Sequence, residues 1–72
     1  MEEKNYLSKE KYEELRQELA QLKTVKRREV AERLEAAKSL GDLAENAEYH
    51  SAREDQSELE SRIAQIENML KL

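Results

Sequence analysis

Two carboxylates follow the only glycine of this 72-residue chain, at the bend that this glycine creates. Gly41 is followed directly by Asp42 and, three residues later, by Glu45. Carboxylate oxygens are the ligands that magnesium prefers, but the ion requires six oxygens in a near-octahedral arrangement. Two carboxylates on an exposed bend would therefore hold it weakly unless another macromolecule or a substrate phosphate supplied the rest. The pair predicts one half of a shared metal site.

The same two residues also fit a purely structural role. Asp-x-x-Glu at the start of a helix is a capping box, in which the aspartate accepts from a backbone amide and the glutamate reaches back. Spacing alone does not separate this alternative from the metal site. Nearby, Leu43 lies at the apex of the bend with nothing to cover it, which favours contact with a partner, whereas His50 and Glu48 are interpreted as surface residues.

The composition predicts one all-α unit to carry this bend. Charged residues make up 42% of the chain, and there is one glycine and no proline, so the turns that a sheet needs are missing. Absence of cysteine excludes disulfides and suits a cytoplasmic protein. No apolar run approaches the roughly 20 residues of a membrane span, and the charged N-terminus does not resemble a signal peptide, so we expect no membrane association.

Apolar spacing of three and four residues predicts two long helices. We expect a lead-in at residues 1–7, a first helix at 8–40 capped by Ser8, a tip at 41–45 and a second helix at 46–71. The resulting fold is a long antiparallel two-helix coiled-coil hairpin with an acidic tip. At about 1.5 Å per residue, arms of roughly 30 residues give a rod of about 45 Å.

The two apolar stripes match each other in an antiparallel register. Residues that pair across such a hairpin have residue numbers with a nearly constant sum. The sum is 85 for the pairs Leu15–Leu70, Leu19–Ile66, Leu22–Ile63 and Lys26–Leu59, and 86 for Val30–Gln56, Leu34–Ala52 and Ala37–Tyr49. The slip of one residue falls between the two groups. In this register Lys26, or its neighbour Val25, occupies the seam, and Lys26 and Gln56 interrupt its apolar character. We expect a monomer.

Charge is distributed unevenly between the two arms. Nine basic and seven acidic residues lie between Lys9 and Lys38, against two basic and eight acidic ones between Asp42 and Leu70. The two arms therefore attract each other, and the basic run at positions 23–28 is interpreted as pairing with the acidic second arm. A phosphate-binding patch would carry a stronger positive balance.

The segment from Gly41 to Gln56, GDLAENAEYHSAREDQ, closely resembles the tip of the Gre transcript cleavage factors of bacteria, the GreA group above all. Upstream, the run LAQLKTVKRR at 19–28 and the run at 36–38 resemble the first helix of that family, and IENML at 66–70 resembles the end of its second helix. The resemblance covers nearly the whole chain, and the GDLxENAEY core is highly specific.

The resemblance implies a transcription elongation factor rather than an enzyme. In this family the hairpin enters the secondary channel of a backtracked bacterial RNA polymerase and stimulates the polymerase to cleave its own RNA. Carried over by position, Asp42 and Glu45 help to hold the second catalytic Mg²⁺ and orient the attacking water, with aspartates of the polymerase completing the coordination. The match assigns contacts with polymerase or with the 3′ end of the displaced RNA to Lys38, Leu43, Asn46 and Arg53.

One departure and three alternatives accompany this interpretation. Gre factors carry a C-terminal domain resembling the FKBP fold, and because this chain stops at Leu72 we expect the N-terminal coiled-coil domain alone. The alternatives are a structural coiled-coil module, a nucleic-acid-binding arm, and a channel-binding inhibitor that does not stimulate cleavage. The acidic second helix disfavours the arm, and the intact GDLAEN motif favours cleavage over inhibition.

Overall fold

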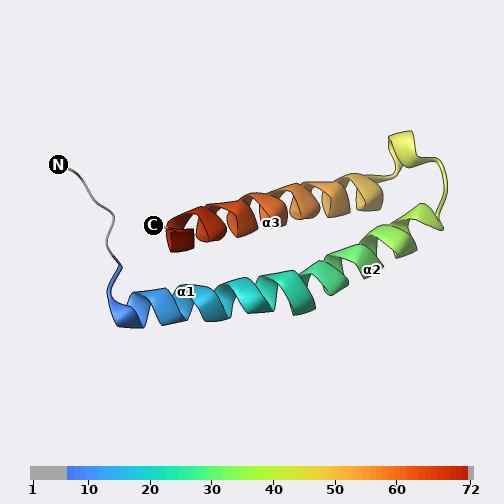
Figure 1. Cartoon of the computed structure of the whole chain (residues 1–72). Helices are drawn as coiled ribbons and strands as arrows, with labels where there is room; N and C mark the ends of the chain where they lie inside the picture. Colours follow the sequence, from blue (N-terminus) through green and yellow to red (C-terminus); the bar gives the residue numbers. More distant parts are fainter. Residues whose placement is uncertain (1–6, 72) are drawn as a thin grey trace.

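The computed structural model describes residues 7–71 as a long helical hairpin (Figure 1). One arm contains α1 (Lys9–Gln21), the π-helix η1 (Leu22–Lys26) and α2 (Arg27–Lys38), and the other arm is α3 (Ala47–Lys71). A short 3-10 helix, η2 (Leu43–Glu45), lies in the tip between them. The principal extents are 52 × 24 × 13 Å. The predicted all-α antiparallel hairpin is confirmed, whereas the predicted lead-in lies outside the described residues except for Leu7.

Ser8 caps the first helix, as its residue type predicts. Its side-chain oxygen accepts a hydrogen bond from the Lys11 backbone N–H at 3.0 Å, and its carbonyl accepts one from Tyr12 N–H at 2.9 Å. A hydroxyl at this position satisfies one of the amides that a helix start leaves without a partner. The rod therefore has a defined beginning.

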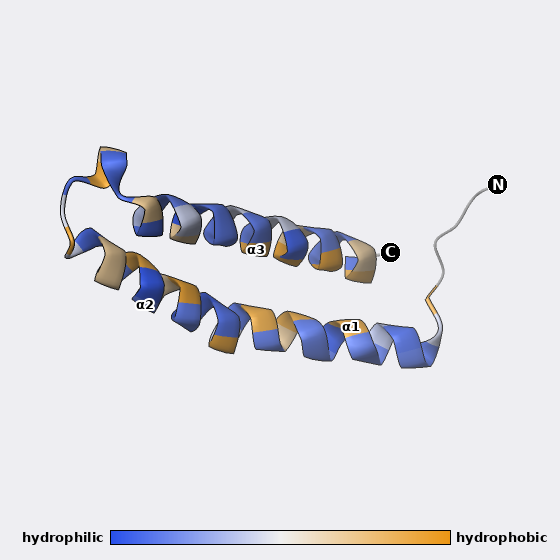
Figure 2. Cartoon of the chain, turned by 180° about the vertical axis from the view of Figure 1, so that it is seen from behind, coloured by the Kyte–Doolittle hydropathy of each residue, from blue (hydrophilic) through white to orange (hydrophobic). Residues whose placement is uncertain are grey.

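One apolar seam runs between the two arms. Figure 2 shows the hydrophobic segments of the arms facing each other along the rod. The buried apolar side chains are Leu15, Val30, Ala37, Ala52, Leu59, Ile63 and Ile66. Val30, Leu59 and Ile63 form a cluster near the middle, with Leu19, Leu22 and Leu34 packed against it. All of these residues belong to the two predicted stripes, so the interface contains little besides this single seam.

The π-helix η1 explains the slip of one residue in the register. Along the first arm the buried and half-buried seam residues Leu22, Val25, Val30 and Leu34 follow one another at spacings of three, five and four, while α3 keeps the alternation of three and four that a heptad requires. The first arm thus contains one residue too many, and a π turn accommodates one extra residue within a helix. Backbone N–H of Arg27 donates to the carbonyl of Leu22 across this turn. The hydroxyl of Thr24 donates to the Ala20 carbonyl at 2.7 Å.

The expectation that Lys26 interrupts the seam is wrong. Its side chain is 57% exposed and lies 3.8 Å from the Glu29 carboxylate, whereas Val25 is half-buried. The wider π turn changes the direction in which residues 22–26 project, which explains why Val25 and not Lys26 lies closer to the partner helix. Gln56 is half-buried, as its seam position predicts.

Ion pairs between the arms line the seam. Arg27 donates two hydrogen bonds to Glu60, at 2.9 and 2.7 Å, and Arg62 donates two to Glu18, at 2.9 and 3.0 Å. Two further cross-arm pairs are Lys23 with Glu67, at 2.9 Å, and Arg33 with Asp55. The predicted pairing of the basic run with the acidic arm is therefore present, although exposed pairs contribute only about 0–1 kcal/mol each. The main effect of these cross-arm ion pairs is to favour one register of the two arms over others.

The two ion pairs with two hydrogen bonds each, Arg62–Glu18 and Arg27–Glu60, also lower the pKa values of their carboxyl groups. The hydrogen bond from Arg62 lowers the pKa of Glu18, and that from Arg27 lowers the pKa of Glu60. A carboxyl group whose pKa is lower in the folded state stabilises the fold above its unfolded pKa, and this contribution is lost as pH falls through the folded pKa.

Deletion of Thr24 should leave the hairpin folded and raise its melting temperature. Removing one residue from η1 converts the π turn into α-helix and gives the pairs on its two sides the same sum, which is 84 in the numbering of the shortened chain. The matched control is deletion of Ser57, which is exposed in α3 and whose loss widens the slip to two residues; this variant should melt far lower. Thermal melts followed by circular dichroism compare them. Equal melting temperatures for the two deletions would contradict this account of the register.

Replacement of Glu60 by glutamine should lower the melting temperature at pH 7 but not in acid. At a pH well below its lowered pKa the carboxyl of Glu60 is protonated in the unmutated chain too, so the difference between the two proteins should shrink toward zero. Glu54→Gln, at an exposed position outside the cross-arm pairs, serves as the control. A difference that is the same at both pH values would mean that the Arg27 pair does not contribute through charge.

Candidate functional site

Two consecutive left-handed residues form the bend at the tip. After α2, the amides of Leu40 and Gly41 donate to the carbonyls of Ala37 and Lys38, each at 3.0 Å. Gly41 then has φ +79° and Asp42 has φ +45°. A Cβ on Gly41 would meet no atom within 4 Å, so the requirement for glycine is conformational and not steric. Aspartate is among the few other residues that adopt this conformation readily, and it therefore extends the bend.

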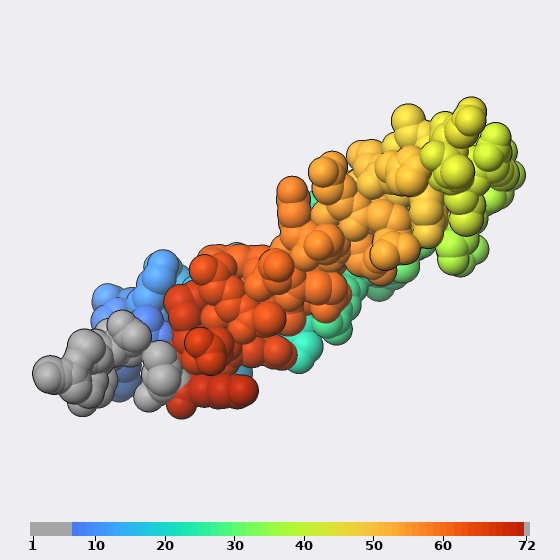
Figure 3. Space-filling model, turned by 90° about the horizontal axis from the view of Figure 1, so that it is seen from above, coloured from blue at the N-terminus to red at the C-terminus, as the bar shows by residue number. Residues whose placement is uncertain are grey.

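The acidic turn, which we define as residues 42–45, follows this bend. Its 3-10 geometry is closed by hydrogen bonds from Glu45 N–H to the Asp42 carbonyl, at 3.1 Å, and from Asn46 N–H to the Leu43 carbonyl, at 3.3 Å. Figure 3 shows the tip as one blunt end of the rod, opposite the C-terminal end of α3. The side chains of Asp42 and Glu45 are both exposed. Within residues 7–71, neither carboxylate has a hydrogen-bond or ion-pair partner, which leaves their oxygens available to ligands.

The capping-box alternative for Asp42 is wrong, because the Asp42 side chain makes no capping hydrogen bond. The cap of α3 is Asn46, whose side-chain oxygen accepts from Tyr49 N–H at 3.0 Å. The signature Asp-x-x-Glu lies four residues before the residue that does the capping, and Asn46 is an equally good cap residue. The two tip carboxylates are therefore not consumed by helix capping.

Asn46 ties the two arms together beneath the tip. Its amide nitrogen donates to the carbonyl of Ala37, at 2.6 Å, and to that of Gly41, at 3.3 Å. It is the one buried polar side chain among the described residues, with 9% of its surface exposed. The Ala37 carbonyl belongs to the last turn of α2, where helix carbonyls lack a partner in the helix itself. Asn46 therefore satisfies the end of one helix and the start of the other; its predicted contact with polymerase or RNA stays a prediction.

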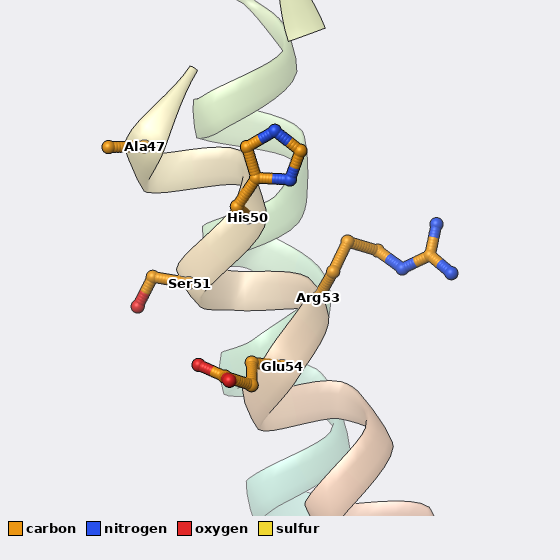
Figure 4. A pocket seen from close by; sticks show the side chains of 5 residues that line it. All are labelled: Ala47, His50, Ser51, Arg53 and Glu54. Atoms are coloured by element: carbon orange, nitrogen blue, oxygen red, sulfur yellow. The ribbon is translucent and has the colours of Figure 1, made fainter. Parts of the chain in front are cut away.

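His50 and Arg53 extend from the first two turns of α3. The Nε2 of His50 lies 2.9 Å from the carbonyl oxygen of Ala44, and the His50 ring packs edge-on against Tyr49. Arg53 donates to the Tyr49 hydroxyl at 3.1 Å, with its guanidinium 6.0 Å from the ring centre. Figure 4 shows Arg53 projecting away from Ser51 and Glu54. An open surface hollow of about 710 Å³ lies among Ala47, His50, Ser51, Arg53 and Glu54.

The other predicted site residues surround the acidic turn. Lys38 ends α2 and is exposed, and within the described chain no carboxylate neutralises Lys38 or Arg53. That these two form one basic spot stays a prediction. Leu43 is 39% exposed within the acidic turn, and Leu40, which sequence reasoning overlooked, is 67% exposed just before it. Apolar side chains therefore flank the carboxylates.

Residues 7–71 contain no group of three or more His, Cys, Asp or Glu side chains that could hold a metal ion. Asp42 and Glu45 supply oxygen donors of the type that Mg²⁺ takes, but they are two residues and Mg²⁺ needs six oxygens. The donor type therefore fits magnesium, and the donor number fits only a site that another molecule completes.

Comparison with known proteins places the hairpin among transcription factors. The family described as "Transcription elongation factor, N-terminal", which comprises GreA and GreB, matches residues 5–72. The chain is 58% identical over 59 residues to Transcription elongation factor GreA of Bacillus velezensis, covering 82% of the chain and 38% of that protein. It is 53% identical over 70 residues to GreA of Geobacillus kaustophilus and 51% identical over 70 residues to GreA of Bacillus cytotoxicus, in each case covering 96% of the chain and 44% of the relative.

The chain thus spans about two fifths of the length of these curated relatives. No solved structure matches it. None of the helices described here is long and apolar enough to cross a membrane.

Asn46→Ala should destabilise the hairpin markedly. The lost cap costs about 1 kcal/mol, and loss of the hydrogen bonds from the amide to the Ala37 and Gly41 carbonyls costs roughly a further 0.5–1.5 kcal/mol each. Asn46→Asp separates the two effects, because aspartate caps as well as asparagine but cannot donate to Ala37. We expect Asn46→Asp to be destabilised too. Chemical denaturation measures both, with exposed Glu48→Ala as the control; full stability of Asn46→Asp would reduce the role of Asn46 to capping.

Proposed function

Because this chain belongs to the family of GreA and GreB N-terminal domains of transcription elongation factors, we propose that it delivers its acidic turn to the active centre of bacterial RNA polymerase. The route is the secondary channel, and the result is stimulated cleavage of backtracked RNA. The single observation that supports this most directly is the pair Asp42 and Glu45, exposed at the tip and unused by the fold. The polymerase performs the cleavage, and the hairpin has no nuclease activity of its own.

The shape of the hairpin suits delivery of a small group into a channel. Its long dimension is 52 Å and its narrowest is 13 Å, with the acidic turn at the end remote from α1. Side chains in the seam near the tip are small, namely Ala37 and Ala52, and both are buried. The two arms can therefore lie close together where the rod would have to be most slender.

Asp42 and Glu45 would hold the second Mg²⁺ together with carboxylates of the polymerase. A second metal in such a hydrolysis activates the attacking water or stabilises the leaving oxygen. The residues of this chain contribute oxygen donors carried on a turn whose backbone is closed by its own hydrogen bonds, at 3.1 and 3.3 Å. Donors held in advance lose little conformational freedom when the ion arrives, which favours cooperation with an incomplete site.

The neighbouring side chains have roles that follow from their chemistry. Lys38 and Arg53 are exposed cations without carboxylate partners in the described chain, which favours contact with the phosphates of the displaced RNA 3′ end. Binding of this kind weakens with added salt. Leu43 and Leu40 would contact apolar surface of the channel. We therefore assign recognition to the flanks of the turn and chemistry to its two acids.

Asp42→Ala and Glu45→Ala should each abolish the stimulation of RNA cleavage while the hairpin stays folded. Neither carboxylate bonds to the described residues, so the melting temperature should change little in Glu45→Ala and somewhat more in Asp42→Ala, because alanine adopts the φ of +45° at position 42 less readily than aspartate does. Glu48→Ala, exposed in the first turn of α3, is the control and should be nearly silent. The assay follows shortening of labelled RNA in a stalled, backtracked bacterial polymerase, with this chain at high concentration.

A second form of the assay places residues 1–72 in the corresponding position of the Bacillus velezensis GreA, so that weak binding by the shorter chain does not decide the result. Stimulation by the Asp42→Ala/Glu45→Ala double variant at the parent's rate would overturn the shared-metal proposal. Binding to polymerase without any stimulation by the unmutated tip would favour the inhibitor alternative.

A further inference from the structure

His50 connects the body of α3 to the acidic turn. Its Nε2 lies 2.9 Å from the Ala44 carbonyl oxygen, six residues earlier in the chain. A carbonyl oxygen only accepts, so Nε2 must carry the hydrogen and donate it. Ala44 lies between Asp42 and Glu45, and the backbone hydrogen bonds of the turn use the carbonyls of Asp42 and Leu43 but not that of Ala44. The imidazole therefore satisfies the remaining central carbonyl of the turn.

The backbone alone does not fix the turn relative to the helix. Between the 3-10 turn, which ends at Glu45, and α3, which begins at Ala47, lies Asn46 with the extended angles φ −90° and ψ +100°. Helical hydrogen bonding is interrupted there, so rotation about Asn46 would swing the turn on the end of the rod. Asn46 itself holds the α2 side of the tip, through Ala37 and Gly41. The bond from His50 holds the turn at the Ala44 carbonyl, between the two acids.

We infer that His50 is a positioning residue that fixes the orientation of the acidic turn on the rod through its hydrogen bond to the Ala44 carbonyl. The ring is oriented by its edge-on contact with Tyr49, at 5.9 Å between ring centres. His50 is exposed and lies off the apolar seam, so packing of the hairpin does not account for the contact. Consequences for RNA cleavage rest on the proposed function, whereas the effect on the turn itself does not.

The chain offers a closely matched test of this bond. Glutamine places its side-chain amide nitrogen where Nε2 of histidine lies, while asparagine places it near Nδ1, too short to reach Ala44. His50→Gln should therefore preserve the bond, and His50→Asn and His50→Ala should lose it. We would compare the three variants with the unmutated chain by hydrogen exchange of the Glu45 and Asn46 amides, the two donors that close the turn, using NMR of the 72-residue chain.

Exchange of both amides should be faster in His50→Asn and His50→Ala by roughly fivefold, the factor that corresponds to one neutral hydrogen bond. His50→Gln should match the unmutated chain, and amides in the middle of α3, such as that of Leu59, should exchange alike in all four proteins. Equal exchange of the tip amides in the asparagine and glutamine variants would overturn the inference, as would slower exchange in His50→Ala.

Cleavage assays then test the link to function. In the backtracked complex, His50→Asn and His50→Ala should lower the maximal cleavage rate, with the half-saturating concentration of the chain unchanged, and His50→Gln should restore the rate. If Asp42→Ala has no effect either, the proposed function fails while the exchange result still decides the role of His50. If Asp42→Ala abolishes stimulation and all His50 variants cleave at the parent's rate, His50 does not position the acids.

Discussion

The amide side chain of Asn46 closes the hairpin at the one place where neither helix can continue. It donates to carbonyls at the end of one arm and accepts from an amide at the start of the other, at 2.6, 3.3 and 3.0 Å. Because the Asn46 side chain is buried, replacing it with an apolar one would remove these bonds without giving water free access to the groups they satisfy. These bonds allow a tight bend, and the two left-handed residues that form it, Gly41 and Asp42, stay exposed.

Because other residues close the hairpin, its folding does not depend on bonds from the carboxylates at the tip. The seam and the cross-arm ion pairs hold the arms in register, the π turn absorbs the extra residue of the first arm, and Asn46 completes the end. Asp42 and Glu45 remain exposed and without partners in residues 7–71. Unused, exposed carboxylates on a closed turn are what a site shared with another macromolecule requires.

The sequence predicted the hairpin well because the seam obeys a counting rule. Pairing sums located the bend, and the slip from 85 to 86 already contained the extra residue of η1, although a π turn was not foreseen. Lys26 was misplaced for that reason: a continuous α-helix puts it in the seam, and a π turn puts Val25 closer. Charge asymmetry between the arms anticipated the Arg27–Glu60 pair.

The local structure of the tip was harder to predict, because two overlapping signatures competed. Both Asp42-x-x-Glu45 and Asn46-x-x-Tyr49 begin with a good cap residue, and only the left-handed backbone at Asp42 shows which one caps α3. The hydrogen bonds from the Asn46 amide to the Ala37 and Gly41 carbonyls, and the one from His50 to the Ala44 carbonyl, depend on the backbone path of the bend. The spacing of apolar residues does not predict that path. The resemblance to Gre factors identified the acids but not the side chains that hold their turn.

We propose that the acidic turn supplies half of a magnesium site to bacterial RNA polymerase. The most direct measurement is the Mg²⁺ dependence of RNA cleavage by a backtracked bacterial polymerase, with and without a saturating amount of this hairpin. If the site is shared, the hairpin should lower the Mg²⁺ concentration needed for half-maximal cleavage, and replacing Asp42 and Glu45 by their amides should remove this effect. An identical Mg²⁺ dependence in the presence and absence of the hairpin, despite faster cleavage, would contradict this proposal.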